Sequence, residues 1–510
     1  MARIAERPPI VIGVDLGNAS CRMAPWRNVN SHSPTPDTMG FRSCPAVVAR
    51  DHEEGGWLAG ASALEIAYRD GVELFDHLKD GILQERGANA RKTAVQRLLS
   101  KLKFDLQAEC AARVIDAVLS VPYSYTLKQR RALRNACSLA GLPVAGLINE
   151  PEAAVLGYRI DEQIEEGSER ILVFDAGATR CTASVVRLSK QGAYIDIELL
   201  SEAHAVTEEG EPVGGDRIDA RLLEMFERGR LQIPPLPSTE EQAAGDQMDP
   251  VEYERWLQQQ LRRVLREARH QLSGETSFEF SVPWAEESLG RLTRDHLERW
   301  ASFDTEITAA IQMAVQGARD RDAPNGLRND QIDRVLITGG LNRSPLIRRL
   351  VDHFPHVEPC EDGFEEYAVA YGAARCAAIL TGRCEGVVFR PRETPAFGIR
   401  TGIDTFDKVI PENAPPGFKA KKVYTLPNRY ASQMVLEVCQ GFSRRFHEEL
   451  SLGAKELPLQ FPEGAGKGSY LEREIHVEME LADTRLLVTV TDRTKGISQP
   501  VPDKLELEAR

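Results

Sequence analysis

Two short segments of the chain repeat the same pattern, and this repeat constrains the fold more than any other feature. The first segment is 10–18, IVIGVDLGN, and the second is 171–179, ILVFDAGAT. Each is an apolar, β-rich run followed by Asp, one residue, Gly and a small or polar residue. This pattern predicts a strand that turns back as a hairpin, with a carboxylate at the strand end. We therefore expect an α/β fold of two duplicated lobes, with Asp15 and Asp175 facing a common cleft.

The glycine two residues after each aspartate indicates phosphate binding. Gly17 and Gly177 let the backbone approach a phosphate, whose oxygens the amide groups of a turn can surround. A carboxylate at such a turn can hold Mg²⁺, often through water. A single Asp-x-Gly segment is better explained as a turn capped by Asp, but two copies with matching flanks favour a phosphate and metal site.

A third segment, 335–345 with the sequence VLITGGLNRSP, predicts a strand, a tight turn and a helix from about Pro345. Gly339 and Gly340 permit the close approach of a flat ring, on which Arg343 can stack. The structural alternative is an ordinary turn between a strand and a helix.

Helical patterns dominate up to about residue 383. Apolar positions in 126–141 recur at helical spacing, with Thr126 as the N-cap and Gly141 at the C-terminal end. Residues 253–272 are also amphipathic, and 231–250, rich in Pro, Glu and Gln, predicts a loop.

The character of the sequence then changes to alternation. Residues 474–481 and 486–490 predict a β-hairpin with a turn at 482–485, and 434–438 predicts another strand. We expect three parts: a nucleotide-binding domain at 1–383, a linker at 384–396, and a β-rich domain at 397–510 that binds a substrate or partner.

Charge and cysteine content exclude several classes of protein. The net charge of −14 argues against nucleic-acid binding, and no apolar run reaches the ~18 residues of a membrane span. The charged start of the chain predicts no signal peptide. The nine cysteines form no Cys-x-x-Cys pair, which predicts reduced thiols and a cytoplasmic location.

Several segments resemble the seventy-kilodalton heat-shock chaperones of the DnaK type. Order and spacing agree over about residues 8–383, and residues 397–495 resemble the family's peptide-binding β domain more weakly. The segments that carry the resemblance are 10–18; 118–123, VLSVPY; 129–130, QR; 140–142, AGL; 148–154, INEPEAA; 213–219, VGGDRID; 339–343, GGLNR; 368–374, AVAYGAA; 409–413, VIPEN; and 438–441, VCQG.

The resemblance implies an actin-like ATPase fold that binds ATP or ADP with Mg²⁺. Asp15 and Asp175 would hold the hydrated metal, and Glu150 would orient water near it. For Glu150 alone, the alternative is an acid stabilised by the dipole at a helix N-terminus. Lys79 matches the family's catalytic lysine imperfectly, and an ordinary surface lysine is the alternative.

The remaining roles that the resemblance implies concern the nucleotide. The phosphates would be approached by the turn residues Gly17 and Asn18 and by Gly177, Gly214 and Gly215. Adenosine would be held by Arg269 and Ser273 on one side and by Gly339, Gly340 and Arg343 on the other. Pro122 and Arg130 match a relay that carries the nucleotide state toward the β domain.

The chain departs from the family at the phosphate end. After Gly17 the family has two threonines, where this chain has Asn18 and Ala19. After Asp175 the family has three glycines and then Thr, Phe and Asp, but Arg180 and Thr182 stand here in place of that Thr and Asp. We therefore expect nucleotide binding with slow hydrolysis, and Thr182→Asp should raise turnover.

The leading interpretation is an ATP-dependent, chaperone-like protein of the stress response, whose nucleotide state is coupled to the binding of peptides or proteins. The alternatives are a nucleotide-gated interaction module with little hydrolysis and, less favoured, a sugar or metabolite kinase of the same fold. Candidate partners are unfolded peptide segments or a dedicated protein, with a J-type co-chaperone and an exchange factor.

Two features of the C-terminal part bear on coupling. The linker segment 386–391, GVVFRP, keeps the family's apolar stretch but lacks its acidic end. The tail 497–510 has helical character only at 504–510, so we expect no helical lid and rapidly exchanging peptide binding.

Overall fold

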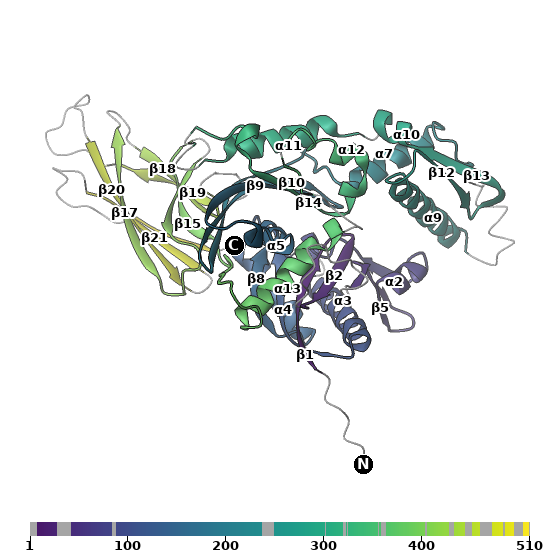
Figure 1. The fold of residues 1–510 in the computed structure, drawn as a ribbon, viewed down its shortest axis with the longest axis horizontal. Helices are drawn as coiled ribbons and strands as arrows, with labels where there is room; N and C mark the ends of the chain where they lie inside the picture. The colour runs from purple at the N-terminus through teal and green to yellow at the C-terminus, as the bar shows by residue number, and fades with distance from the viewer. Residues whose placement is uncertain are drawn as a thin grey trace, which may run out of the picture.

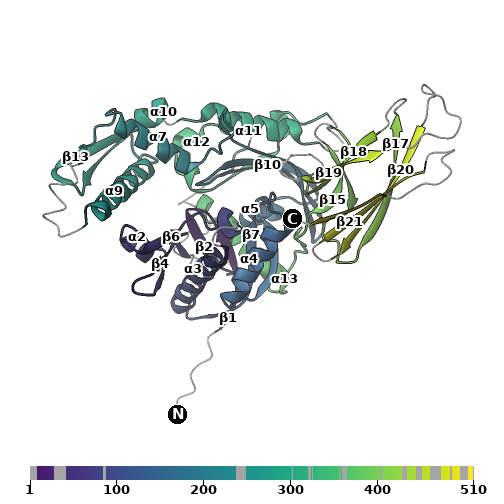
Figure 2. The same ribbon diagram turned by 180° about the vertical axis from the view of Figure 1, so that it is seen from behind.

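The computed structural model describes residues 8–27, 42–83, 88–236, 249–300, 302–319, 323, 325–354, 356–358, 364–402, 405–427, 433–443, 451–459, 472–482, 485–493 and 503–508. These residues form an elongated molecule, in which an α/β body is followed at one end by twisted sheets made from the C-terminal part of the chain (Figures 1 and 2).

The first main sheet has five strands in the order β3-β2-β1-β7-β8. Strand β1 pairs with β2 as an antiparallel hairpin and with β7 in parallel, and β7 pairs with β8 in parallel. The apolar side chains of β1 are buried, including Ile12 and Val14. The strands are β1 (Pro9–Leu16), β2 (Ser20–Pro25), β3 (Arg42–Pro45), β7 (Arg113–Val121) and β8 (Val144–Asn149).

A small three-stranded sheet and several helices accompany the first sheet. As predicted, Thr126 caps α4: its hydroxyl accepts from the backbone of Gln129, whose side chain accepts from Thr126 in return. Gly141 follows the helix with a φ of 71°. The elements are β4 (Val48–Asp51), β5 (Trp57–Ala59), β6 (Val72–Phe75), α2 (Ala61–Ile66), η1 (Asp80–Leu83), α3 (Ala88–Glu109) and α4 (Leu127–Leu139).

The second main sheet has four strands in the order β11-β10-β9-β14. They are β9 (Gly167–Ala176), β10 (Cys181–Gln191), β11 (Tyr194–His204) and β14 (Arg334–Thr338). Helices α11 (Asp304–Gly317) and α12 (Pro345–Arg348) cover one side of this sheet, and α5 (Glu150–Gly157) and α13 (Ala368–Leu380) lie between the two main sheets (Figure 1). One buried cluster contains residues of both sheets and of α13, so the sheets share a core.

The remaining elements of the α/β body extend the second sheet outward. The amphipathic segment 253–272 forms most of helix α9. This helix begins at Pro250, because the side chain of Asp249 caps its first turn. These elements are α6 (Ile160–Gln163), α7 (Gly215–Glu227), α9 (Pro250–Gln271), β12 (Ser277–Val282), β13 (Ala285–Thr293), α10 (Arg294–Trp300), η2 (Asn329–Gln331), η3 (Gly340–Arg343) and η4 (Phe364–Glu366).

The C-terminal sheets, as we call the two sheets formed by β15–β22, have the strand orders β16-β15-β18-β19 and β17-β20-β21-β22. The predicted alternation is confirmed in β20, where Ile475, Val477 and Met479 are buried at successive odd positions. The strands are β15 (Ala396–Arg400), β16 (Phe406–Ile410), β17 (Lys419–Pro427), β18 (Gln433–Gly441), β19 (Ser451–Pro458), β20 (Glu472–Ala482), β21 (Arg485–Asp492) and β22 (Asp503–Glu508).

The expectation of helical character at 504–510 is wrong. Residues 503–508 form β22, which pairs with β21 in antiparallel register. Leu505 and Leu507 pack against the buried cluster of the C-terminal sheets, so tertiary pairing overrides the helix propensity of Lys and Glu. The turn residues 483–484 and the tail segment 494–502 lie outside the described residues.

The segment between the α/β body and the C-terminal sheets contacts both. Val388 forms backbone hydrogen bonds with Ala193 (2.7 Å) and Ile195 (3.0 Å), and Phe389 is buried. Within the predicted linker 384–396, Glu393 forms a 2.6 Å ion pair with Arg134 of α4.

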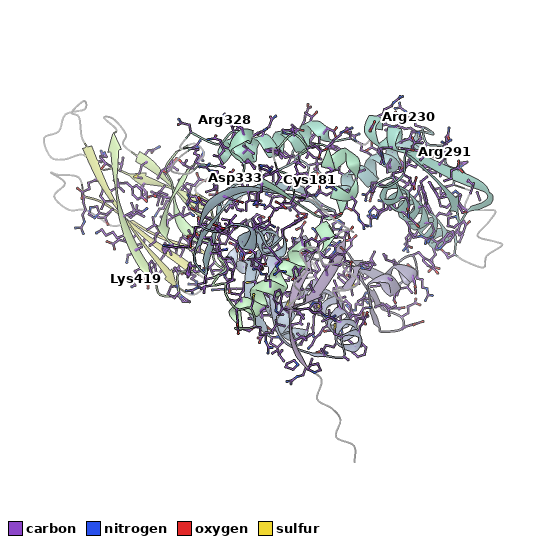
Figure 3. The ribbon with its side chains drawn as sticks, in the orientation of Figure 1. Cys181, Arg230, Arg291, Arg328, Asp333 and Lys419 are labelled. Carbon is purple, nitrogen blue, oxygen red and sulfur yellow. The ribbon has the colours of Figure 1, made fainter. Side chains whose placement is uncertain are left out.

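Side chains divide as expected between surface and core. Figure 3 shows Arg230, Arg328 and Lys419 on the outside, whereas Cys181, the first residue of β10 in the second sheet, is buried. The eight cysteines within the described ranges form no disulfide with one another, and Cys360 lies outside those ranges. No helix among the described residues is long and apolar enough to cross a membrane.

Candidate functional site

A cavity of about 1350 Å³ lies where the hairpins of the two main sheets face each other. Most of the candidate residues that were named from the sequence line this cavity. Among the described residues, the candidates Gly214 and Ser273 do not line it. The candidates that line the cavity are Asp15, Gly17, Asn18, Lys79, Glu150, Asp175, Gly177, Gly215, Arg269, Gly339, Gly340 and Arg343.

The two predicted hairpins have the same turn geometry. The amide of Gly17 donates to the carbonyl of Ser20 at 3.0 Å, and the amide of Gly177 donates to the carbonyl of Arg180, also at 3.0 Å. In each hairpin the aspartate is the last polar strand residue before the turn. Both carboxylates therefore reach the cavity from equivalent positions on the two sheets, because the local sequence specifies the same turn twice.

A buried ion pair lies between the two aspartates. The Lys79 ammonium donates to the Glu150 carboxylate, and both side chains are largely shielded from solvent. Burial alone would lower the pKa of Lys79, but the carboxylates of Glu150 and Asp15 raise it above its ordinary value. The hydroxyl of Ser120 donates to Asp15 at 2.7 Å and fixes that carboxylate. Lys79 is thus part of the cavity and not an ordinary surface lysine.

The charge balance of this cluster fits a bound cation. Burial raises the pKa of Glu150 and of Asp175, and the charge of Asp15 raises both further, because one lysine does not compensate three carboxylates. A divalent metal would neutralise the excess. Mg²⁺ usually keeps several water ligands and is bound through one or two carboxylates, which is the number that Asp15 and Asp175 supply here.

Two glycine segments support the turn of the second hairpin. A side chain at Gly339, whose φ is 88°, would place its Cβ only 2.5 Å from Oδ1 of Asp175, so glycine alone fits there. Gly214 packs against the backbone of the turn and lies behind the lining, while the amide of Gly215 donates to the carbonyl of Gly177 at 3.1 Å. The 213–219 segment therefore positions the turn more than it contacts the cavity.

The end of the cavity assigned to adenosine contains two arginines and a histidine. Asp219 holds Arg269 at 2.6 Å. Burial, reinforced by the charge of Arg269, lowers the pKa of His270 to about 4, so its imidazole is neutral at pH 7. Arg343 is about half-exposed and lies 3.3 Å from Glu366, which leaves its flat face accessible for stacking.

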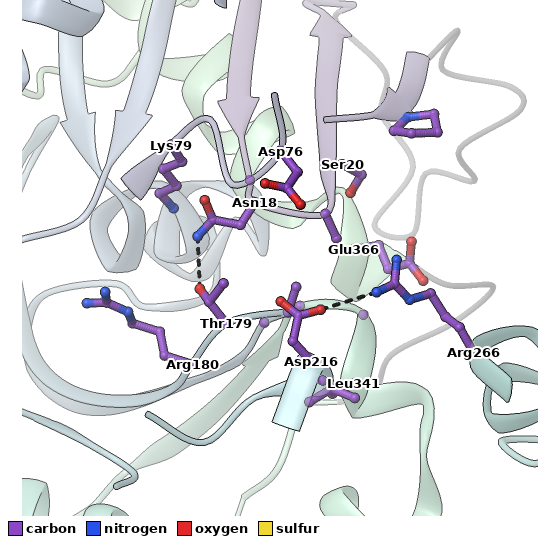
Figure 4. A pocket seen from close by; sticks show the side chains of 18 of the residues that line it. Asn18, Ser20, Asp76, Lys79, Thr179, Arg180, Asp216, Arg266, Leu341 and Glu366 are labelled. Atoms are coloured by element: carbon purple, nitrogen blue, oxygen red, sulfur yellow. Dashed lines mark hydrogen bonds and ion pairs between the residues drawn. The ribbon is translucent and has the colours of Figure 1, made fainter. Parts of the chain in front are cut away.

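The phosphate end is bridged by polar side chains from both halves of the body (Figure 4). The Asn18 amide donates to Asp80 and to Thr179, at 2.8 Å each. Arg180 points into the same region and lies 3.6 Å from the Asp80 carboxylate. Arg180 thus brings positive charge to the place where phosphate oxygens are expected, with Asp80 as its present counter-ion.

Further contacts close the outer edge of the cavity. His77 lies 3.0 Å from Asp216 of α7, and Arg255 of α9 lies 3.4 Å from Asp70. The hydrogen bonds that His77 donates to the carboxylates of Asp216 and Asp76 raise its pKa to about 10, so this histidine is protonated at pH 7.

Among the cavity-lining residues that sequence reasoning missed are Asp80, Glu202, His204 and His270. Asp80 follows Lys79 directly and His270 follows Arg269, so adjacency to named candidates was a usable signal. Glu202 and His204 lie at the end of an ordinary amphipathic strand, and only pairing with β10 brings them to the site.

The predicted Pro122–Arg130 pair connects the cavity with the C-terminal sheets. Pro122 lines the cavity, and its carbonyl accepts from the buried Arg130 guanidinium at 2.8 Å. The same guanidinium donates to the carbonyl of Glu393 at 3.4 Å and lies 4.7 Å from the ring centre of Phe442. Arg130 therefore contacts both the linker and the segment that follows β18.

Comparisons with known proteins agree with this geometry. The sequence profile of the family described as Hsp70 protein matches residues 83–502. Proteins named chaperone protein DnaK from Thermotoga petrophila, Thermotoga sp. strain RQ2 and Thermotoga maritima are each 27% identical over 478 residues, which cover 89% of this chain and 74% of the relative. Because the profile spans more than half of the chain, the protein belongs to the Hsp70 family.

Proposed function

We propose that this protein is an ATP-dependent molecular chaperone, in which the nucleotide bound between two actin-like lobes controls a peptide- or protein-binding β domain at 397–510. Membership of the Hsp70 family implies the actin-like ATPase fold, a chaperone-family function, and nucleotide binding with Mg²⁺. The observation that carries the assignment to this cavity is the matched pair of hairpin turns, which bring Asp15 and Asp175 into the cavity that the Lys79–Glu150 pair also lines.

In this proposal each part of the cavity has a distinct task. Asp15 and Asp175 hold the hydrated Mg²⁺, which when bound neutralises phosphate charge. The phosphates lie against the turns at Gly17 and Gly177 and against Gly215, where the absence of a side chain permits close approach, and Glu150, held by Lys79, orients water.

The base lies between the two sides of the adenosine end. Arg269 and the neutral His270 flank it from α9, with Ser273 at the end of that helix, and Gly340 and Arg343 flank it from the opposite side. The cavity is large enough for a nucleotide with its hydrated metal, since pockets of ~300–1,000 Å³ already enclose drug-sized ligands.

Coupling to the β domain is proposed to run through Pro122 and Arg130. A change of nucleotide that moves the Pro122 turn shifts the guanidinium, which also holds Glu393 and Phe442. Unfolded peptide segments or a dedicated protein are the proposed ligands of the C-terminal sheets, with a J-type co-chaperone and an exchange factor as regulators. The chain is proposed to act in the cytoplasm, in the response to stress.

Calorimetry with Asp15→Asn tests the nucleotide site. The change removes a charge that faces the metal, so the affinity for Mg·ATP should fall by roughly tenfold or more, equivalent to ~1.4 kcal/mol. The matched control is Asp105→Asn, which removes a half-exposed carboxylate paired with Lys101 on α3, far from the cavity lining. An unchanged affinity of Asp15→Asn would remove this aspartate from the metal site.

Single-turnover hydrolysis separates this proposal from a nucleotide-gated module that binds ATP without turning it over. Family membership favours the chaperone. Slow but measurable hydrolysis that accompanies peptide release supports it, whereas tight ATP binding with no hydrolysis would favour the module.

A further inference from the structure

A row of polar side chains crosses the second sheet at the cavity. In the antiparallel pairs β9–β10 and β10–β11, Asp175 stands opposite Thr182, and Thr182 stands opposite His204. Residues that face each other across antiparallel strands project to the same side of the sheet, with Cβ atoms about 5 Å apart. All three side chains line the cavity. His204 is therefore two strands away from the proposed metal-binding aspartate, with Thr182 between them.

A second pair of facing residues, one step further along the same two strands, places a carboxylate beside His204. Ser184 stands opposite Glu202, and its hydroxyl donates to Oε2 of that carboxylate at 3.0 Å. The other carboxylate oxygen lies 3.6 Å from Nε2 of His204. On its far side, Nδ1 of His204 lies 3.0 Å from Oγ1 of Thr182.

The chemistry of these groups sets the direction of the hydrogen bonds. A carboxylate can only accept, so the imidazole presents its Nε2–H to Glu202 and keeps an unprotonated Nδ1. Nδ1 then accepts from the Thr182 hydroxyl, whose oxygen lone pairs remain directed at the cavity. In an arrangement of hydroxyl, imidazole and carboxylate, the imidazole can take the proton of the hydroxyl, and the carboxylate stabilises the resulting imidazolium. The hydroxyl oxygen can then accept a proton from another group.

We propose that Thr182, His204 and Glu202 form a proton relay for ATP hydrolysis, which takes the place of the carboxylate that the family carries at position 182. The inference rests on the proposed function. As the water oxygen bonds to the γ-phosphorus and the bond to the β-phosphate oxygen breaks, the water proton passes to Oγ1 of Thr182. The Thr182 proton passes to Nδ1 of His204, and ADP keeps the electron pair of the broken bond.

The surroundings suit this task. The imidazolium that forms is stabilised by Glu202, which is itself held by Ser184. The His204 side chain is 26% exposed, so the proton can leave to solvent after each turnover. Asp175, which faces Thr182 from β9, and Arg180, in the turn before β10, also line the cavity and bring opposite charges to it.

The first experiment measures hydrolysis and binding in the same preparations. His204→Ala should lower single-turnover hydrolysis by roughly a hundredfold, as expected for the loss of a positioned base, while the dissociation constant for Mg·ATP stays within about twofold. Added imidazole should raise the single-turnover rate of His204→Ala at least tenfold. The matched control is His52→Ala, which removes a half-exposed histidine on another sheet and should change neither quantity nor respond to imidazole.

The second experiment needs no nucleotide. Nitrogen NMR of the full-length, ligand-free protein should show His204 as the Nε2–H tautomer, with Nδ1 accepting a hydrogen bond that is lost in Thr182→Val. Thr182→Asp places a carboxylate directly at the water, so in that background His204→Ala should cost less than about threefold. The tautomer measurement, which leaves His204 in place, keeps the proposal testable if His204→Ala folds poorly.

The outcomes are distinct. Full hydrolysis by His204→Ala, loss without rescue by imidazole, or the Nδ1–H tautomer would each overturn the relay. ATP binding by the wild-type protein without any hydrolysis overturns the relay but leaves the nucleotide site standing. Failure of the wild-type protein to bind Mg·ATP overturns the proposed function and the relay together.

Discussion

Phe442 provides the sharpest test of how the C-terminal sheets are held against the α/β body. Although it follows β18, its ring is only 3% exposed and belongs to the buried cluster that joins the two main sheets. It lies 5.2 Å from the ring of Tyr123 and 4.7 Å below the Arg130 guanidinium. Phe442→Ala removes both contacts without touching the cavity.

The expected magnitude follows from these contacts. Replacing a buried phenylalanine by alanine typically costs ~3–5 kcal/mol, which includes the cavity left behind. We take the lower bound, because neighbouring side chains will fill part of the space. The docked state should then be less stable by about 3 kcal/mol, so the ratio of docked to undocked protein should fall by roughly a hundredfold. A double-mutant cycle with Arg130→Met should show a coupling of ~1–2 kcal/mol from the cation–π contact.

Limited trypsin digestion of the full chain measures this equilibrium. In the docked state Arg392 pairs with Asp196 at 2.9 Å, which protects the bond after Arg392. When opening is fast compared with cleavage, the cleavage rate follows the undocked population, so Phe442→Ala should be cut roughly a hundredfold faster there. Val435→Ala, an exposed change in β18, is the control. Equal cleavage rates for Phe442→Ala and the wild-type protein would refute the reasoning.

Two further variants test charge effects elsewhere. His77→Gln removes the contact with Asp216, so release of a fluorescent ADP should be faster by less than about fivefold, the limit for a half-exposed pair. Because the pKa of His77 in the folded protein is raised to about 10, the histidine keeps its charge at neutral pH, so the difference should persist at pH 8 and disappear as the pH rises through 10. A difference that vanishes by pH 8 contradicts this. Arg375→Met leaves the Asp161 carboxylate buried without its partner, because both side chains are at most 1% exposed. The free energy of unfolding in urea should therefore fall by ~3–5 kcal/mol. The double variant Arg375→Met with Asp161→Leu should recover most of that loss. A cost below about 1 kcal/mol for the single variant would contradict it.

The elements that were predictable from the sequence are those whose signals are local. The hairpin turns at Asp15 and Asp175 follow from the residues of each turn, and the cap at Thr126 follows from Gln129 three residues later. The alternation in 474–481 likewise predicted β20, because one buried face requires a period of two.

The errors arose where tertiary contacts decide. Residues 504–508 contain strong helix formers, yet Leu505 and Leu507 alternate with charged residues, and the free edge of β21 pairs with them as β22. The alternation was present in the sequence and was the better signal. The placement of Lys79 against Glu150 had no such signal, because their pairing depends on how the β6–η1 turn meets the first turn of α5.

The second sheet shows why motif reading underestimates a site of this kind. A motif is read along one strand, so replacement of an acid by Thr182 looks like the loss of a catalytic group. A site on a sheet is assembled across strands, where the neighbours of Thr182 are Asp175 on one side and His204 on the other. A chain can therefore exchange a carboxylate on β10 for an imidazole on β11, provided that the side chain between them can carry a proton. Threonine meets that condition, whereas valine, which has the same shape, does not. The hydroxyl at position 182 therefore distinguishes a site whose base has moved to the neighbouring strand from a site that has lost its base.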